Sequence, residues 1–500
     1  MESLSIKEIV NAVNGVLLCG EESTLINSIS TNSNKLEENA LFVPIKGERV
    51  DGHTFINDAF ASGAVACFTS NEIPLNKDYV YIKVEDTLNA LQALGAYYRS
   101  KFNIPVIGIT GSVGKTTTKE MVTAALETKY NVIKTIGNMN SQVGLPQMMM
   151  RFEKEHEIAV IEMGISEEGE MERLTFIAKP ELAIVTNIGV SHIAQLKSRE
   201  NIRKEKLNII NAFKESSVLF LNDNDELLKE LCEYKKVNLI GNKEMLPNYN
   251  ENSQLCDTID LSFTTREKLL NCKVISFGTN EGAIYQAVDI KTLNGSTKFT
   301  LRVHNNEDGS VEKYGDGEEI TLSVLGIHNV YNALVSLAVA NHYNIPVAVA
   351  KIGLEKYKPI ANRGEIKKVR GITIIDDTYN ASPDSMKSGL SVLCQLENVK
   401  RRIAVLADIR ELGEISQRSH YEVGEYIAKE AVDELVTIGS EALNIALGVK
   451  DHNKQIKINS FMSNMDAINY LKASILEGDA LLIKGSNSMR TNEIVNALCE

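Results

Sequence analysis

The feature that most restricts the fold of this chain is a glycine-rich segment, Thr110-Gly-Ser-Val-Gly-Lys-Thr-Thr-Thr118, which follows an apolar run and opens a helical stretch. Glycines let the backbone curl so that its amides face a phosphate, and the N-terminus of the following helix adds positive potential. Lys115 can reach the terminal phosphates of a nucleotide, and the Thr116 hydroxyl can ligate Mg²⁺. The strict phosphate-loop pattern has a glycine where this chain has Ile109. Strand, loop, Lys-Thr pair and helix agree, which favours a phosphate loop over an ordinary glycine turn.

The length and charge of the chain limit its organisation and its partners. At roughly 150 residues per domain, the 500 residues predict three domains. Lys and Arg number 53 against 66 Asp and Glu, so the formal net charge is −13. This acidity argues against a nucleic-acid or anionic-membrane partner, because both require a basic surface. Small anionic ligands remain compatible, since a local nest of amides binds phosphate even in an acidic protein.

Cysteine usage and the first residues indicate a cytoplasmic protein. The seven cysteines are scattered without a CxxC pair, so neither a disulfide framework nor a zinc site is expected. The N-terminal segment MESLSIKEIVNAV carries acidic residues early and predicts an amphipathic helix rather than a signal peptide. No uninterrupted apolar stretch approaches the length of about 18 residues that a membrane span needs. We therefore expect a protein of the reducing cytoplasm with no membrane partner.

The alternation of segments predicts an α/β fold. Residues 1–101 are turn-rich and β-leaning, and they end in a helical stretch over 87–101. From Pro105 onward, short apolar runs alternate with helical periods, which is typical of a parallel, doubly wound sheet. Ligands of such sheets lie beyond the carboxyl ends of the strands. The central runs cover residues 106–109, 158–161 and 182–185, and they are followed by Thr110-Gly111, Glu162 and Thr186-Asn187.

The rest of the chain continues this pattern with one interruption. Residues 222–320 are more polar, and we expect excursions there, a loop over 242–252 and a small β region. In the segment that begins at Asn329, apolar residues recur at helical spacing. After Pro359 the alternation restarts and predicts a second nucleotide-binding-like sheet, with runs over 372–375, 403–406, 435–438 and 481–483.

Polar residues near several runs are candidates for chemistry, and each has a plainer interpretation. Glu162 could reach a metal bound at the loop, or it could simply cap its strand. Asp376 and Asp377 could bind metal, act as acid and base, or hold a ribose, and a turn with an Asx cap is equally compatible. Three further residues carry little signal in isolation: Arg363, which could clamp a phosphate, His192 and Lys206.

Taken together, motifs that span nearly the whole chain resemble those of the Mur ligases, the cytoplasmic ATP-dependent amide ligases of peptidoglycan synthesis. TGSVGKTTTKE looks like their phosphate loop, which also lacks the first Walker glycine. The DDTYN and KGERVDGH stretches single out the members that add D-alanyl-D-alanine. The matching segments follow the family's order: LFVPIKGERVDGHTF (41–55), GNMNSQVGLP (137–146), IEMG (161–164), TNIGVSHI (186–193), GIHNVYNAL (326–334), DDTYNASPDSM (376–386), LADIRELGE (406–414) and LIKGSNSM (482–489).

The resemblance implies an α/β protein of three domains. Residues 1–101 would form a small N-terminal domain that binds the UDP-substrate, and residues 102–358 a central ATP-binding domain with the phosphate loop and a mostly parallel sheet. Residues 359–500 would form a C-terminal Rossmann-like domain. The implied reaction joins D-alanyl-D-alanine to UDP-N-acetylmuramoyl-tripeptide through an acyl phosphate, with ATP and Mg²⁺ as cofactors, in a monomer. Because phosphate contacts would come from two domains, we predict that the C-terminal domain closes over ATP before chemistry.

The resemblance also implies roles for individual residues. Nucleotide contacts would come from Thr110, Gly111, Ser112, Gly114, Lys115, Thr116, Thr117, Asn329, Asn332, Arg363 and Asp377. Two Mg²⁺ sites would use Thr116, Glu162, His192 and Lys206, the last as a carbamylated lysine, for which Lys204 is a competing alignment. The catalytic residues would be Lys115, His192, Lys206 and Arg363. The substrate contacts would be Lys46, Gly47, Asp51, His53, Asn140, Tyr379 and Asn380.

Three alternatives remain open on the sequence. A paralogue could apply the same chemistry to another acid or amine. A phosphate-loop ATPase that acts on a partner protein would leave the DDTYN segment and Lys206 unexplained. A non-catalytic binding protein would not need intact Lys115, Thr116, Glu162, His192 and Asp377.

Several positions depart from the family's usual patterns. A T-D-S-R-like segment near the uridine is Thr31-Asn-Ser-Asn34 here, which loses an acid and an arginine. The motif usually written G-D-M is Ala407-Asp408-Ile409, and Asn487 stands where an arginine is common. The region 235–270 is longer than usual. These departures bear on the exact acceptor, whose third peptide residue could be lysine or diaminopimelate, and not on the reaction class.

Overall fold

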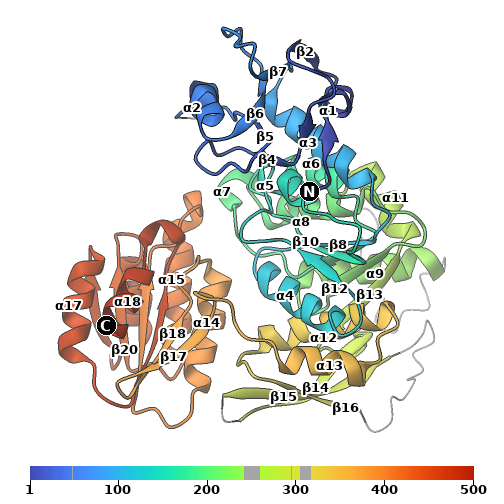
Figure 1. Cartoon of the computed structure of the whole chain (residues 1–500). Helices are drawn as coiled ribbons and strands as arrows, with labels where there is room; N and C mark the ends of the chain where they lie inside the picture. Colours follow the sequence, from blue (N-terminus) through green and yellow to red (C-terminus); the bar gives the residue numbers. More distant parts are fainter. Residues whose placement is uncertain (48, 241–258, 294, 305–316) are drawn as a thin grey trace.

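Three α/β domains succeed one another along the chain, each built around a sheet of its own (Figure 1). The structure is a computed structural model that describes residues 1–47, 49–240, 259–293, 295–304 and 317–500. The expected loop over 242–252, and much of the longer region 235–270, lie outside the described residues. The three-domain α/β architecture confirms the fold class predicted from the sequence, whereas the domain boundaries at 101 and 358 stay predictions.

The N-terminal domain is built on a five-stranded sheet in the order β2-β7-β6-β5-β4, with bounds Val16–Cys19, Val80–Lys83, Ala64–Thr69, Ala40–Phe42 and Ser28–Ser30. β1 (Leu4–Ser5) and β3 (Leu25–Ile26) form a separate two-stranded ribbon, and α2 (Ile56–Ala61) packs on β6. The expected N-terminal helix is α1 (Ile6–Ala12), which begins with a Ser5–Glu8 capping box. α3 (Thr87–Ser100) leads toward the central domain, and its Gly95 allows close packing because an added Cβ would lie 2.7 Å from the Pro146 Cβ.

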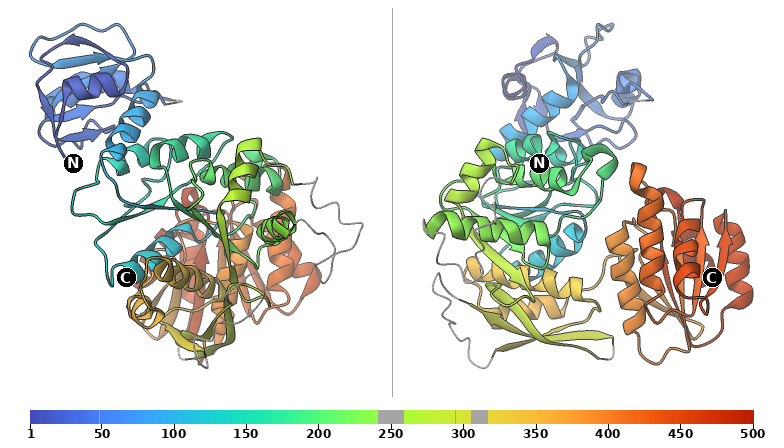
Figure 2. Two further views of the ribbon diagram at one scale, coloured as in Figure 1. Left: turned by 90° about the vertical axis from the view of Figure 1, so that its right-hand side faces the viewer. Right: turned by 180° about the vertical axis from the view of Figure 1, so that it is seen from behind.

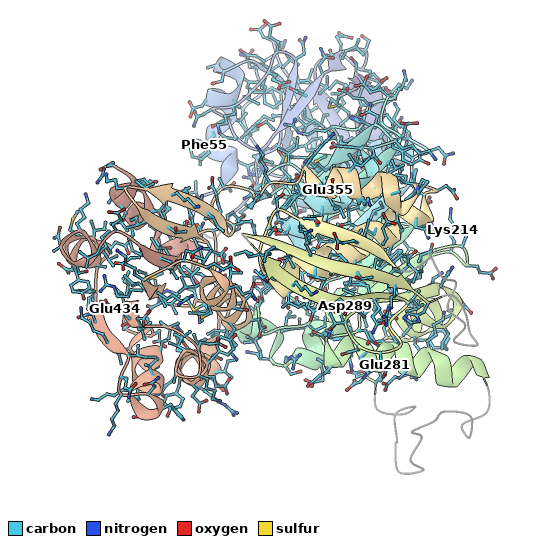
Figure 3. All side chains as sticks on the ribbon, turned by 90° about the horizontal axis from the view of Figure 1, so that it is seen from below. Phe55, Lys214, Glu281, Asp289, Glu355 and Glu434 are labelled. Atoms are coloured by element: carbon cyan, nitrogen blue, oxygen red, sulfur yellow. The ribbon has the colours of Figure 1, made fainter. Side chains whose placement is uncertain are left out.

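The central domain carries a nine-stranded sheet in the order β16-β15-β14-β13-β12-β11-β8-β10-β9. The strands from β8 to β14 run parallel, and β15 is antiparallel to both of its neighbours. The predicted runs are strands β8 (Val106–Thr110), β10 (Ile158–Glu162) and β11 (Leu182–Val185). The others are β9 (Val132–Lys134), β12 (Val218–Asn222), β13 (Lys273–Gly278), β14 (Tyr285–Leu293), β15 (Ser296–Val303) and β16 (Glu318–Leu322). β14 to β16 form the small β region expected in the polar stretch, and Asp289 (Figure 3) has a φ of +53 where β14 shifts register against β15.

Helices cover both faces of the central sheet, which explains why its strands are continuous apolar runs. On one face, Ile107 and Ile109 pack with α4 (Lys115–Leu126), α12 (Ile327–His342) and α13 (Val347–Glu355). On the other face, Val106 packs in a cluster with α3, α5 (Gly144–Met149), α6 (Glu170–Ala178), α8 (Arg199–Leu207), α9 (Glu226–Ile240) and α11 (Phe263–Asn271). The helix predicted around Asn329 is therefore α12, with its apolar stripe on the sheet.

The C-terminal domain repeats this layered design with six strands in the order β17-β18-β22-β19-β20-β21. Their bounds are Glu365–Val369, Ile372–Asp376, Asp479–Lys484, Arg401–Ala407, Glu434–Ile438 and Lys457–Phe461, and β17 alone in this sheet is antiparallel. One face carries α14 (Pro383–Gln395), α15 (Ser416–Ile427) and α16 (Leu443–His452), and the other α17 (Asn464–Ser474) and α18 (Asn492–Cys499). The four runs predicted after Pro359 are confirmed as β18, β19, β20 and β22.

The arrangement of the domains brings strand ends of the central sheet toward the C-terminal domain. The N-terminal domain lies at one end of the central domain, and the C-terminal domain lies beside it (Figure 2). The loop after β11 makes contact across this boundary, because Val190 and Ile193 pack against the apolar core of the C-terminal domain. Within the described ranges, no helix combines the length and apolar character needed to cross a membrane.

Candidate active site

The predicted phosphate loop joins β8 to α4 at the carboxyl edge of the central sheet. Gly111 has a φ of +147, and a Cβ at this position would overlap the hydroxyl oxygen of Thr186. Gly114, with a φ of +87, is the last residue before α4. Both glycines are therefore required by the backbone path, as the sequence predicted. The Lys115 ammonium folds back over the loop and donates to the Gly111 carbonyl at 2.7 Å.

The segment after β11 clamps the phosphate loop from the side. The Thr186 hydroxyl donates to the Val113 carbonyl at 2.6 Å, and the Asn187 side-chain oxygen accepts from the Val113 amide at 2.8 Å. The Ser112 hydroxyl accepts from the Gly189 amide at 2.9 Å. Sequence reasoning noted that Thr186 and Asn187 end a strand but gave them no role. Both residues reach the phosphate loop because their strand, β11, lies beside β8 in the sheet, and the sequence does not reveal this strand order.

A hydroxyl and a carboxylate meet beside the loop. The Thr116 hydroxyl donates to Glu162 Oε2 at 3.0 Å, and the side-chain Nδ2 of Asn140 donates to Glu162 Oε1 at 2.8 Å. Glu162 is 3% exposed, and its backbone amide donates to Thr135 Oγ1 at 2.8 Å. Hydroxyl and carboxylate oxygens are the hard ligands that Mg²⁺ prefers, so these residues fit that ion. The part of the chain that the structure describes holds no cluster of three or more His, Cys, Asp or Glu side chains suited to a metal ion.

Two lysines share one carbonyl of the loop. Lys206 on α8 is 2% exposed, and its ammonium lies 3.3 Å from the Gly111 oxygen that also accepts from Lys115. Burial, and next the neighbouring charge of Lys115, lower the pKa of Lys206 well below the usual lysine value. Burial also lowers the pKa of Lys115. Lys204, two residues earlier, instead pairs with Asp260 at 2.8 Å away from the loop, so the structure brings Lys206 alone of the two into the site.

His192 lies in the loop after β11, directly after Ser191, whose hydroxyl donates to the Ser112 carbonyl of the phosphate loop at 3.4 Å. It precedes the short helix α7 (Ile193–Leu196) with a left-handed backbone, and its Nδ1 lies 2.8 Å from Glu411 Oε2 of the C-terminal domain. The hydrogen bond from His192 holds the pKa of Glu411 below its usual value, against the effect of burial. Sequence reasoning assigned no role to Glu411, because nothing local indicates a contact between two domains.

The two asparagines of α12 are buried next to the phosphate loop. Asn332 accepts from the Thr118 hydroxyl at 2.9 Å and thereby ties α12 to α4. The Asn329 side chain donates to the Leu325 carbonyl at 2.7 Å and accepts from Asn332 at 3.4 Å. A Cβ added to Gly114 would lie 3.5 Å from Asn332 Oδ1, which places this pair at the start of α4.

The C-terminal domain contributes a second group of predicted residues. The Arg363 guanidinium lies 3.7 Å from the centre of the Tyr379 ring, and Asp377 pairs with Lys484 at 2.6 Å. Lys484 also donates to the Asn380 carbonyl at 2.9 Å. The sequence did not lead us to assign a role to Lys484, although the polar residues Lys484-Gly485-Ser486 after the last apolar run indicated this position. A cleft of about 540 Å³ adjoins these residues and is lined by Asn362, Thr378, Tyr379, Asn487, Ser488, Arg490, Asn492 and Glu493.

Asp376, the residue before Asp377, is buried, whereas Asp377 is partly exposed. Asp376 is 1% exposed, pairs with Lys367 at 2.6 Å and accepts from the Thr378 hydroxyl at 2.7 Å. The Asp376 carboxylate therefore binds partners of its own domain, Lys367 and Thr378. The pair therefore divides into a buried structural acid and Asp377, whose carboxylate is partly exposed.

The predicted substrate residues of the N-terminal domain form one turn. Asp51 caps the 3-10 helix Gly52–Phe55, and its Oδ1 lies 2.6 Å from His53 Nδ1. Hydrogen bonds from the backbone and side chain of His53 hold the pKa of Asp51 below its usual value. The His53 Nε2 accepts from the Ser70 amide at 3.1 Å, while Lys46 and Gly47 are exposed. Asp51 and His53 thus hold the turn that presents Lys46 and Gly47, which stand in a different domain from the phosphate loop.

Comparison with known proteins agrees with this arrangement. The family models described as Mur ligase family, catalytic domain; Mur ligase middle domain; and Mur ligase, glutamate ligase domain match residues 25–99, residues 109–258 with 250–340, and residues 362–487. The chain is 35% identical over 499 residues to the UDP-N-acetylmuramoyl-tripeptide--D-alanyl-D-alanine ligase of Bacillus subtilis (strain 168), which covers 99% of this chain and 98% of the relative. The enzyme of that name from Escherichia coli (strain K12) is 30% identical over 507 residues, covering 100% and 99%.

Solved structures share the whole architecture. A crystal structure of MurF from Acinetobacter baumannii matches with a TM-score of 0.83 at 27% identity and covers 100% of this chain and 99% of its own. MurF ligase from Thermotoga maritima in complex with ADP matches with a TM-score of 0.76 at 27% identity, covering 94% and 97%. Family models over all three domains and full-length relatives at 30% identity or more lead to one conclusion. This chain belongs to the Mur ligase family.

Proposed function

We propose that this protein is an ATP-dependent amide ligase that joins D-alanyl-D-alanine to UDP-N-acetylmuramoyl-tripeptide and so forms the UDP-linked pentapeptide of peptidoglycan synthesis. The observation that carries the proposal is the 35% identity, over 99% of the chain, to the Bacillus subtilis ligase named for these substrates. The site contains the groups that such a reaction needs. The proposal therefore rests on full-length similarity together with local chemistry.

The chemistry begins from a carboxylate, which is a poor electrophile for an amine at neutral pH. Transfer of the γ-phosphoryl group of ATP to a carboxylate oxygen of the tripeptide gives an acyl phosphate and releases ADP. The amine of D-alanyl-D-alanine then attacks the acyl carbon, and the tetrahedral intermediate expels phosphate. The protein contributes mainly positioning and charge neutralisation.

Positive charge in the site comes from two domains. Lys115 lies on the phosphate loop of the central domain, and its pKa is lowered first by burial and to a lesser degree by the positive charge of Arg363 from the C-terminal domain. Stacking on Tyr379 fixes the plane of the Arg363 guanidinium. The loop amides, with Thr110, Ser112 and Thr117 beside them, would face the phosphates. Asn329, Asn332 and Asp377 would lie along the nucleoside, with Asp377 at the ribose.

Magnesium would be held at two places. Thr116 and Glu162 suit one ion, which would neutralise phosphate charge. A second ion would use His192 and Lys206, with Lys206 carbamylated. Lys206 suits this modification because its lowered pKa favours the neutral amine that adds carbon dioxide. The resulting carbamate is an anion, so it would replace repulsion between Lys115 and Lys206 by attraction.

The acceptor would be held by residues in all three domains. Lys46, Gly47, Asp51 and His53 would hold the UDP end of the acceptor, and Asn140, Tyr379 and Asn380 would contact its peptide or the dipeptide. The chain would act as a cytoplasmic monomer on small molecules, with no nucleic acid or membrane, in keeping with its net charge of −13. Domains at 1–101, 102–358 and 359–500, with closure of the last over ATP, would complete the enzyme.

The direct test is an assay with Mg-ATP, D-alanyl-D-alanine and UDP-N-acetylmuramoyl-tripeptide whose third residue is lysine or diaminopimelate. Product mass and phosphate release are followed together, with Lys115→Met as the control for contaminating ligase. The expected result is a UDP-linked pentapeptide that requires both substrates and forms with one phosphate per molecule. Phosphate without product, or no turnover with either tripeptide, would favour a paralogue that uses another acid or amine. Asn32, whose side chain closes a turn with the Asn34 amide at 2.9 Å, would then be the first place to look.

A further inference from the structure

Glu411 belongs to the C-terminal domain, yet its carboxylate forms a hydrogen bond with a residue of the central domain. Its Oε2 lies 2.8 Å from Nδ1 of His192. The backbone carbonyl of Glu411 also accepts from the Ala194 amide at 3.4 Å. Gly413 packs against the same residue, because a Cβ there would lie 3.1 Å from the Ala194 Cβ. The loop after β19 and the loop after β11 therefore meet through one compact set of contacts.

Both ends of this contact have unusual backbone conformations. His192 has a φ of +62 and Glu411 a φ of +66, a region that residues other than glycine seldom occupy. Such conformations persist only where the surroundings impose them, and they concentrate at functional sites. Here the surroundings are apolar, since Val190 and Ile193 on either side of His192 pack against the core of the C-terminal domain. The loop around His192 is thus shaped by the domain that docks on it.

The contact selects one tautomer of the histidine. Glu411 carries a carboxylate, which only accepts, so Nδ1 of His192 carries a proton; in the neutral ring, Nε2 then keeps its lone pair. Nε2 has no hydrogen-bond partner in the described part of the chain. A carboxylate on one ring nitrogen with the other nitrogen free is the arrangement that orients histidines toward metal ions. Because the Glu411 side chain is 55% exposed, the pair adds little to stability, and its orienting effect is the larger consequence.

The histidine segment is also tied to the phosphate loop. The Ser191 hydroxyl donates to the Ser112 carbonyl at 3.4 Å, and the Gly189 amide donates to the Ser112 hydroxyl at 2.9 Å. The loop after β11 therefore contacts both the phosphate loop and the C-terminal domain. The C-terminal domain lies on one side, and the residues that would bind ATP lie on the other.

We propose that Glu411 is a positioning residue that sets His192 for metal binding, so that the second metal site is complete only when the C-terminal domain is docked. This inference rests on the proposed function, because it takes His192 as a ligand of the second ion. On this proposal, the affinity of the second metal site depends on a residue from another domain. In the described part of the chain neither Thr116 nor Glu162 contacts Glu411, so an ion bound by those two residues would be independent of it.

The test measures Mn²⁺ binding by electron paramagnetic resonance in the whole protein, with a non-hydrolysable ATP analogue and the UDP-tripeptide present. Two sites are expected in the parent. Glu411→Ala should weaken one of them by about 10- to 100-fold and leave the other unchanged. Glu411→Gln should lie between, since its amide oxygen still accepts the hydrogen bond without the charge. Glu414→Gln is the matched control, an exposed acid of the same loop for which the described structure gives no ion pair, and it should bind as the parent does.

Steady-state kinetics separates positioning from general damage. In Glu411→Ala, kcat should fall at limiting Mn²⁺ and recover at high Mn²⁺, with the KM for ATP unchanged at saturating metal. Identical Mn²⁺ affinities in the parent, Glu411→Ala and Glu411→Gln would overturn the proposal. A parent that makes pentapeptide but binds one Mn²⁺ would overturn it too, while leaving the proposed reaction intact. A parent that makes no pentapeptide would remove the proposed function itself.

Discussion

Gly111 is the position where one methyl group tests the geometry of the phosphate loop. Its φ of +147 favours glycine, and an added Cβ would overlap the Thr186 hydroxyl oxygen and lie 3.0 Å from the Thr186 Cβ. Thr186 is not free to turn away, because its hydroxyl donates to the Val113 carbonyl at 2.6 Å. Gly111→Ala should therefore displace the loop by on the order of 1 Å. A misplacement of that size lowers the rate of a positioned reaction by about 100-fold.

The expected loss of stability follows from two contributions. The strained backbone at Gly111 costs about 1–3 kcal/mol, and loss of the hydrogen bond to Val113 costs about 1 kcal/mol. The sum, about 2–4 kcal/mol, is a large part of the stability of an ordinary domain. We expect a drop of several degrees in the Tm of the central domain, together with a kcat/KM about 100-fold lower and weaker binding of ADP.

The assay combines phosphate release with both substrates and calorimetric titration of ADP. Gly282→Ala is the matched control, because its φ is +93 and an added Cβ would meet nothing within 4 Å. It should lower stability through backbone strain while leaving catalysis unchanged. Adding Thr186→Ala to Gly111→Ala removes the overlap and should restore part of the rate. A Gly111→Ala enzyme with the parent's kcat/KM and ADP affinity would refute the reasoning.

Three further predictions concern single charges. Glu162→Gln should lower kcat by about 100-fold and raise the Mg²⁺ concentration needed for half-maximal rate. It removes the negative charge that would bind the ion but keeps the shape of the side chain, so Tm should change little. Equal Mg²⁺ dependence in both enzymes would contradict this. Lys206→Gln should abolish activity and Lys204→Gln should retain it, since Lys206 alone of the two lies at the loop; equal activities would remove the proposed carbamate. The pKa of Glu8 is lowered to about 2, first by its hydrogen bond from Lys101, so its stabilising effect is full above the unfolded-state pKa near 4.5 and is lost as the pH falls toward 2. Urea midpoints of Glu8→Gln and the parent should therefore differ at pH 7 and converge near pH 2, and a constant difference across this range would be inconsistent with the pairing.

Much of the fold could be predicted from the sequence because the strands are buried on both faces. Such strands are continuous apolar runs, and the runs at 106–109 and 182–185 match β8 and β11 to within one residue. Strand order could not be predicted in the same way. Thr186 becomes a clamp on the phosphate loop because β11 lies beside β8, and this adjacency is a property of the sheet rather than of any local segment.

The site shows the same division between local and distant information. The phosphate loop is a local pattern, and its glycines could be identified from spacing alone. Lys204 and Lys206 differ by two positions on one helix, which at about 100° per residue places them on nearly opposite sides. Packing decides which side faces the loop, and the structure buries Lys206 while leaving Lys204 to pair with Asp260. The sequence could offer both lysines but could not choose between them from helical periodicity.

The contact of Glu411 with His192 could not be predicted from local sequence, because the two residues belong to different domains. It is also a contact through which the central and C-terminal domains would form one site. The carboxyl edge of the central sheet supplies Lys115, Glu162 and the loop that carries His192. The C-terminal domain supplies Arg363, whose charge lowers the pKa of Lys115 after burial does, and Glu411, which contacts His192. An ATP analogue that contacts both domains would favour docking through Arg363, and docking would in turn set His192 through Glu411. Metal binding, nucleotide binding and domain docking would then stabilise one another, because each requires the same arrangement of the two domains.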